Sequence, residues 1–186
     1  IVSGNKVYIK LHDLYVDICI EDTKIPLKIV ATNFYTWEKK VFTSWKIIDA
    51  VRASISLPSI FKPFEIGEEK FIDGWLKTNL PILELHWKDI IAVSVVREWN
   101  TPKTHRKVLN FNIKKWFFGN TYETLKKTIS IIMANNEDLT LELAWYKEKN
   151  ILLLKPNVSM YEYFDFAKYN QIIQKWYEEI KEKMEE

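Results

Sequence analysis

The chain has 186 residues, of which 47% are hydrophobic and 28% are charged, a balance typical of a globular domain with its own core. Its formal net charge of +2 is too small to indicate nucleic-acid binding by itself, and it has no run of ~18 apolar residues that would span a membrane. The one cysteine, Cys19, excludes an internal disulfide framework and suits a reducing compartment, so we expect a cytoplasmic protein.

The first half of the chain predicts strands and one short helix. Residues 7–11 fit either a strand or a helix end, and residues 16–20 alternate as a strand does. Residues 25–34 (IPLKIVATNF) predict a strong strand, and 40–45 its hairpin partner. Apolar residues three and four apart then predict a helix over 47–55, which Pro58 would stop.

Residues 64–66 and 70–72 flank Gly67-Glu68-Glu69 and predict a second hairpin. Asp73-Gly74 breaks its second strand. Asp73 has two readings. Asp-Gly pairs commonly form turns in which the aspartate bonds its own backbone, whereas a carboxylate at the end of a strand is also where site residues of α/β sheets lie.

The second half predicts two more strands and two helices. Residues 89–96 (DIIAVSVV) are apolar on both faces, which indicates a covered and parallel strand. Residues 121–150 predict a helix that 135–138 could divide, and 151–154 a short strand. Asp165 is a good N-cap for a last helix with its apolar stripe over 166–184.

Two phrases around Asp73 resemble the second half of a patatin-like phospholipase domain. The first is ASISLPSIFKP from Ala53, and the second is DGWLKTNLP from Asp73, in the family's order. Two positions depart from the family. Trp75 stands where the family has glycine or alanine, and Thr36-Trp37 stands where it has Thr-Gly, a glycine that supplies a positive φ angle.

The resemblance implies an α/β fold, a three-layer sandwich whose central, mostly parallel sheet is covered by helices. Residues 1–186 would be the C-terminal part of this single domain. It also implies a lipid acyl hydrolase (a phospholipase or esterase of lipid degradation) with a Ser-Asp dyad. Asp73 would be the catalytic base, Gly74 and Asn79 would support its loop, and no metal or other cofactor is needed.

The nucleophile of such a dyad is missing from this sequence. Glycine occurs only at positions 4, 67, 74 and 119, so neither Gly-x-Ser-x-Gly nor a glycine-rich oxyanion loop is present. Because residue 1 is Ile rather than Met, we expect a fragment whose upstream half carries the serine, and we expect the fragment alone to be inactive. The alternative is a non-catalytic pseudoenzyme that binds lipid or protein.

Other candidates are weaker. Ser54 has no base at predictable spacing and is read as a packing residue, and His12, His86 and His105 show no metal-ligand spacing. Residues 97–118 mix basic and aromatic side chains, which fits a packed surface loop, peripheral contact with an anionic membrane, or single-stranded nucleic acid. We expect a lipid or ester substrate and no nucleic acid, with the missing half or a second copy covering the exposed sheet edges.

Overall fold

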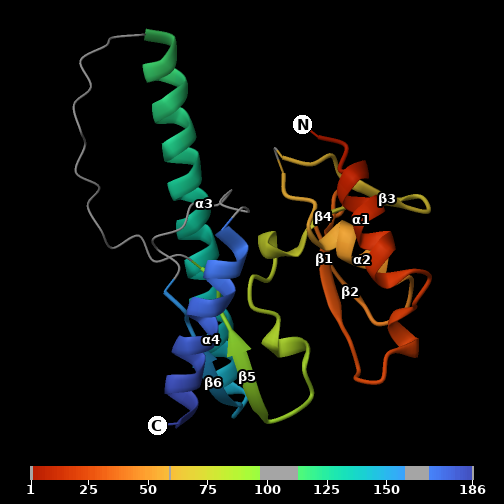
Figure 1. Cartoon of the computed structure of the whole chain (residues 1–186), viewed down its shortest axis with the longest axis vertical. Coiled ribbons are helices and arrows are strands. Elements are labelled where there is room, and N and C mark those ends of the chain that lie inside the picture. Colours follow the sequence, from red (N-terminus) through yellow and green to blue (C-terminus); the bar gives the residue numbers. More distant parts are fainter. Residues whose placement is uncertain (1, 59, 97–112, 158–167, 186) are drawn as a thin grey trace. The chain divides into compact units, whose positions relative to one another are not determined.

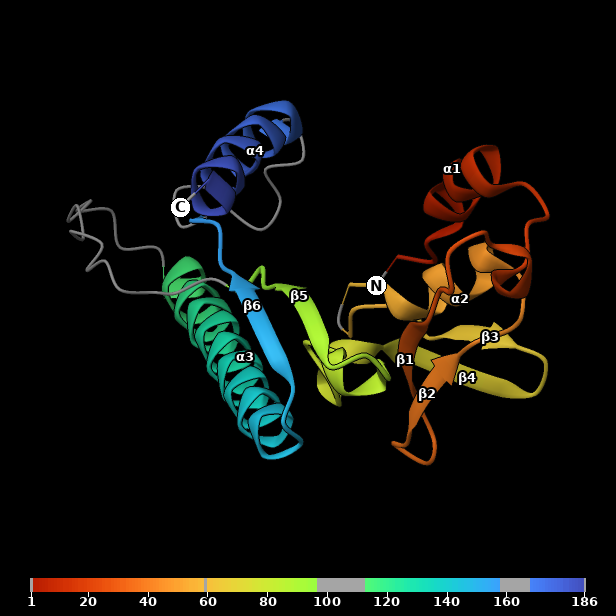
Figure 2. The ribbon, with the colours of Figure 1, turned by 90° about the horizontal axis from the view of Figure 1, so that it is seen from below.

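The computed structural model describes residues 2–58, 60–96, 113–157 and 168–185. The chain divides into two compact units. The first comprises residues 1–87 and 136–147, and the second comprises residues 88–135 and 148–186. Figure 1 and Figure 2 show the helices and strands of each unit.

The first unit holds a four-stranded sheet with two helices. Its strands lie in the order β2-β1-β4-β3, and every neighbouring pair is antiparallel. Helices α1 and α2 lie on one face of this sheet (Figure 2). Its elements are α1 (Asn5–Tyr15), the 3-10 turn η1 (Ile20–Asp22), β1 (Ile29–Asn33), β2 (Lys39–Phe42), α2 (Ile47–Ser54), β3 (Phe64–Ile66), β4 (Glu69–Asp73), and the 3-10 turns η2 (Gly74–Leu76) and η3 (Ile82–Glu84).

The core of this unit lies between α2 and the two inner strands. Helix α2 buries Ile47 and Ile48 of the face predicted from its apolar spacing, together with Ala50 and Ala53, while Val51 and Ile55 are half-buried. Phe42 and Phe71 meet edge to face with ring centroids 5.3 Å apart. The buried cluster consists of Ile20, Ala31, Phe42, Ile47, Ala50, Ala53 and Phe71.

Both predicted hairpins are confirmed. Ile29 pairs with Phe42 in the first, and Phe64 pairs with Phe71 in the second. Gly67 turns the second with φ at 61°, as a short hairpin loop requires. In the first, Trp37 has φ at 59°, so a bulky residue occupies the left-handed conformation that the resemblance assigns to glycine.

The second unit contains a parallel strand pair, β5 (Asp89–Val93) and β6 (Asn150–Leu154), in register from Asp89 opposite Asn150. Both predicted strands are confirmed. Helix α3 (Ile113–Tyr146) connects them, as parallel strands require. Residues 113–135 of α3 belong to this unit, as does α4 (Tyr169–Glu185).

The mixed α/β class is confirmed, with a difference in strand pairing. The larger sheet is antiparallel throughout, and parallel pairing in the described residues is found at β5 and β6. Loop length explains the pairs β1–β2 and β3–β4, since strands joined by short turns pair as antiparallel neighbours. Strand β5 is also covered on one face rather than both, with Ile90 buried and Ile91 60% exposed.

Three local predictions are corrected. The strand over 16–20 is wrong, because Val16 adopts a φ of 46° at the end of α1 and only Cys19 forms a bridge, with Lys46. Residues 7–11 are helical. Helix α3 continues unbroken through 135–138, because asparagine and aspartate disfavour a helix interior only mildly.

Two predictions fall wholly or partly outside the described residues: the basic and aromatic segment 97–118 and the N-cap at Asp165. In the part of the chain that is described, no helix combines the length and apolar character needed to cross a membrane.

Candidate active site around Asp73

Asp73 is the last residue of β4 and lies opposite Ala31 of β1. Its main chain is held on two sides. The Asp73 N–H donates to the carbonyl oxygen of Ser56 at 3.0 Å, and the Asp73 carbonyl accepts the hydroxyl of Thr32 at 3.0 Å. Ser56 and Thr32 are both buried. These two hydrogen bonds to buried residues therefore fix the position at which the Asp73 side chain leaves the sheet.

The carboxylate of Asp73 is half-buried and caps the turn that follows it. Its Oδ1 accepts the main-chain N–H of Trp75 at 3.1 Å, which is the backbone-bonding arrangement expected of a turn aspartate. Burial raises the pKa of Asp73 to about 6, and the amides of Trp75 and Gly74 oppose this rise. The observed geometry is thus compatible with both interpretations of Asp73, as a turn aspartate and as a site residue at the end of a strand. The capped carboxylate is also more basic than an ordinary one, as a general base requires.

Gly74 is needed for space. A Cβ at this position would lie 2.5 Å from the carbonyl oxygen of Val30 and 2.9 Å from its carbonyl carbon. Because both are backbone atoms of β1, the strand cannot move aside cheaply. The glycine of the Asp-Gly phrase therefore lets the turn bearing Asp73 lie directly against the central strand.

Asn79 supports the same loop through α3. Its N–H donates to Oδ1 of Asn136 at 3.2 Å, and its side-chain amide donates to Oε2 of Glu137 at 3.3 Å. Asn136 in turn donates to the carbonyl of Lys77 at 3.2 Å. The side chain of Glu137 is almost fully buried. Asn79 thus anchors the chain after Asp73 to the helix, and its side chain does not bond the carboxylate of Asp73.

The departure at Trp75 has a structural consequence. The indole N–H of Trp75 is buried, and among the described residues it meets no acceptor. A buried donor without an acceptor costs about 1–3 kcal/mol. A glycine or alanine at this position would carry no such cost.

The other candidates stay apart from Asp73. Ser54 is half-buried in the last turn of α2, which fits the packing role predicted for it. The ring Nε2 of His86 lies 3.4 Å from Nζ of Lys28. In the described residues, no group of histidine, cysteine, aspartate or glutamate side chains could hold a metal ion.

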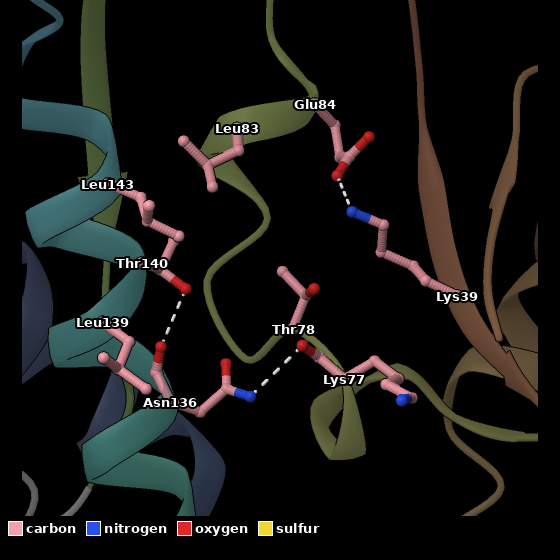
Figure 3. A pocket seen from close by; sticks show the side chains of 9 residues that line it. All are labelled: Lys39, Lys77, Thr78, Leu83, Glu84, Asn136, Leu139, Thr140 and Leu143. Atoms are coloured by element: carbon pink, nitrogen blue, oxygen red, sulfur yellow. Dashed lines mark hydrogen bonds and ion pairs between the residues drawn. The ribbon is translucent and has the colours of Figure 1, made fainter. Parts of the chain in front are cut away.

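A pocket of about 300 Å³ lies between the 77–84 segment and α3 (Figure 3). Lys39 and Glu84 form an ion pair at its rim. Asp73 is not among the lining residues, so this pocket is separate from the carboxylate. The pocket is lined by Lys39, Lys77, Thr78, Leu83, Glu84, Asn136, Leu139, Thr140 and Leu143.

Sequence reasoning missed Arg52, Ser56 and Thr32. Ser56 and Thr32 bond the main chain of Asp73, and Arg52 bonds Ser56. Arg52 and Ser56 are 1% and 0% exposed, respectively. One signal was available: Ile48, Arg52 and Ser56 are four residues apart, so the arginine lies on the same side of α2 as a buried isoleucine.

Comparison with known proteins finds a match over the part of the chain that contains Asp73. Residues 8–86 match the family model of the patatin-like phospholipases, and this stretch contains β1, α2, β4 and Asp73. This segment is therefore similar to part of a patatin-like phospholipase domain.

The chain is also similar to curated proteins of fungi and mycobacteria. It is 29% identical over 143 residues to "Lysophospholipase NTE1" of Debaryomyces hansenii, covering 69% of this chain and 9% of that protein. The same-named protein of Eremothecium gossypii is 27% identical over 172 residues, covering 85% and 11%. An uncharacterized NTE family protein of Mycobacterium tuberculosis is 28% identical over 82 residues, covering 44% and 23%. The chain thus spans about a tenth of the length of the fungal relatives.

Proposed function

We propose that this chain carries the aspartate of a Ser-Asp dyad, and that the complete protein is a lipid acyl hydrolase. One observation carries the proposal: the half-buried carboxylate of Asp73, whose pKa is raised to about 6, at the end of a strand within the patatin-like segment. An ordinary aspartate with a pKa near ~4 is too weak a base to serve well at neutral pH.

In this reaction a serine hydroxyl supplied upstream of residue 1 attacks the acyl carbonyl, and Asp73 takes its proton. The ester bond breaks, and the leaving alcohol receives that proton from Asp73. Water then attacks the acyl-serine with Asp73 again as base, which releases the fatty acid and restores the serine. This scheme needs no metal or other cofactor. The names of the fungal relatives point to a lysophospholipid substrate.

The test is hydrolysis of a short-chain nitrophenyl ester and of lysophosphatidylcholine by the complete protein. Asp73→Asn should abolish both activities, since an amide cannot accept the serine proton, and its oxygen can still accept the Trp75 N–H and preserve the turn. The isolated 186-residue chain should be inactive. Asp17→Asn is the matched control, because Asp17 is exposed and pairs with Lys46, and it should leave both rates unchanged.

Two outcomes would contradict the proposal. An active Asp73→Asn variant would remove Asp73 from the dyad. If the complete protein had no activity and its upstream sequence contained no Gly-x-Ser-x-Gly, the chain would belong to a non-catalytic lipid- or protein-binding relative. Flotation of the protein with liposomes containing anionic lipid would then separate lipid binding from protein binding.

A further inference from the structure

We propose that Arg52 is a positioning residue for Asp73, acting through Ser56; the inference rests on the proposed function. The arginine does not touch the carboxylate. It holds the residue whose carbonyl oxygen accepts the Asp73 N–H, and so sets where the base leaves the end of β4.

The side chain of Arg52 is enclosed, with 1% of its surface exposed. Its guanidinium carbon lies 4.8 Å from the ring centroid of Phe61 and 5.4 Å from that of Phe64, which is cation–π range. Its Nη2 donates to the carbonyl of Ser3 at 2.9 Å. The arginine thus connects α2 with the segment before α1 and with β3.

Gly4 closes this enclosure. It has a φ of 79°, and a Cβ there would lie 2.0 Å from Nη2 of Arg52. A side chain at position 4 would therefore push the guanidinium out of its place. The backbone at Gly4 therefore packs directly against the guanidinium.

The charge of Arg52 is stabilised by hydrogen bonds and aromatic rings rather than by an acidic side chain. Among the described residues no carboxylate forms an ion pair with it, and burial lowers its pKa. A buried charge is costly unless hydrogen bonds and dipoles stabilise it. The hydrogen bonds of Arg52 to Ser3 and Ser56 provide this stabilisation and fix the guanidinium relative to both residues.

Ser56 is the partner that transmits this geometry. Nη1 of Arg52 donates to Oγ of Ser56 at 2.7 Å, and the same hydroxyl donates to the Arg52 carbonyl at 2.8 Å. Ser56 lies just beyond α2, and its N–H donates to the carbonyl oxygen of Ala53 at 3.1 Å. Its carbonyl oxygen then accepts the Asp73 N–H at 3.0 Å.

Arg52→Lys tests the link because lysine keeps the charge but lacks the planar fork that bonds Ser56 and Ser3 together. In the complete protein we expect the kcat for nitrophenyl ester hydrolysis to fall about 10- to 100-fold, the effect of a base displaced by a fraction of an ångström. KM should change little, because Arg52 contacts no substrate. Ser56→Ala should reproduce the loss.

A double variant separates positioning from general destabilisation. In Ser56→Ala, adding Arg52→Lys should cost little further activity, because the arginine acts through the serine. Ile48→Val, a change at a fully buried residue of the same helix, is the stability control and should leave kcat unchanged. Native folding of each variant is checked by circular dichroism.

Hydrogen exchange gives a readout that needs no activity. In Arg52→Lys the amide of Asp73 should exchange about tenfold faster, while the amide of Asn33, bonded to the Glu38 carbonyl, should not change. If the wild type hydrolyses no ester but the Asp73 amide is released, the proposed function fails and the positioning link stands. The link is overturned if Asp73 exchange is unchanged, or if a folded Arg52→Lys variant keeps full kcat.

Discussion

The main-chain N–H of Trp75 donates a 3.1 Å hydrogen bond to Oδ1 of Asp73. The bond makes the aspartate the cap of η2 and stabilises its ionised form. Desolvation outweighs this effect, so the pKa of Asp73 is raised to about 6. The Asp73 side chain therefore terminates the strand and is also kept partly out of water. This desolvation of the carboxylate lowers the stability of the folded state.

The stability cost of Asp73 predicts an unusual pH dependence. The folded chain holds the Asp73 proton up to about pH 6, whereas the unfolded chain releases it near the ordinary value of 3.8. Between these values the folded state binds more protons, so the free energy of unfolding falls as pH rises and is level above about 6. Asp73→Asn should therefore stabilise the protein at about pH 8, by about 1–3 kcal/mol, and by little near pH 4.

Urea unfolding of the complete protein at both pH values measures this difference. Asp17 is the control, because its hydrogen bond to Lys46 and the charge of that lysine lower its pKa. Its ionised form is favoured by folding, so Asp17→Asn should not stabilise the protein at the higher pH. An Asp73→Asn variant that is less stable than wild type at about pH 8 would show that the aspartate is a structural cap alone.

Gly74 predicts a steric effect that Gly67 does not share. Gly74→Ala should lower the free energy of unfolding by about 1–3 kcal/mol, because the added methyl group meets the Val30 carbonyl and must displace a central strand. Gly67 has open space around it and a positive φ, so Gly67→Asn should be nearly neutral, since asparagine accepts that conformation. Thermal unfolding distinguishes the two. A Gly74→Ala variant as stable as the wild type would contradict the steric explanation.

Local patterns in the sequence predicted the elements that bear Asp73. The spacing of Ile47, Ile48 and Val51 predicted α2, and the two short segments on either side of Gly67-Glu68-Glu69 predicted the hairpin that ends at Asp73. These features depend on neighbours within a few residues. A pattern method can therefore find them without knowledge of the tertiary structure.

The contacts that hold Asp73 could not be predicted this way. Asn79 and Glu137 are 58 residues apart in the sequence, and nothing local marks them as partners. In helix α3, Leu139 and Leu143 are 60% and 53% exposed while Glu137 and Thr140 are buried, the reverse of the usual preference for burying apolar side chains. The polar loop at 77–79 contacts the polar side of α3. Hydrophobic periodicity alone does not reveal this contact.

The contact between Asn79 and Glu137 predicts a strong effect of small changes. Asn79→Ala should lower the free energy of unfolding by about 2 kcal/mol, because a buried carboxylate loses a donor. Asn79→Asp should cost more, since it places a second carboxylate beside Glu137. Adding Glu137→Gln to Asn79→Asp should recover part of the loss, with the amide now donating. Chemical denaturation of the four proteins forms the test, and no recovery in the double variant would contradict the contact.

Trp37 predicts a stabilising substitution. Its φ of 59° is a conformation that costs a bulky residue about 1–2 kcal/mol, whereas glycine adopts it freely. The side chain is 70% exposed, so little burial is lost on removing it. Trp37→Gly should therefore raise the free energy of unfolding by about 1 kcal/mol, after the greater flexibility of glycine in the unfolded chain is subtracted.

Trp37→Ala is the matched control, because alanine removes the indole but keeps the Cβ that makes a positive φ costly. Thermal unfolding should rank Trp37→Gly above wild type and Trp37→Ala at or below it. If both variants are equally destabilised, the packing of the indole contributes more to stability than its exposure indicates. Relief of backbone strain at position 37 is then not the deciding effect. A gain confined to glycine would show that the hairpin of β1 and β2 tolerates a strained residue at position 37.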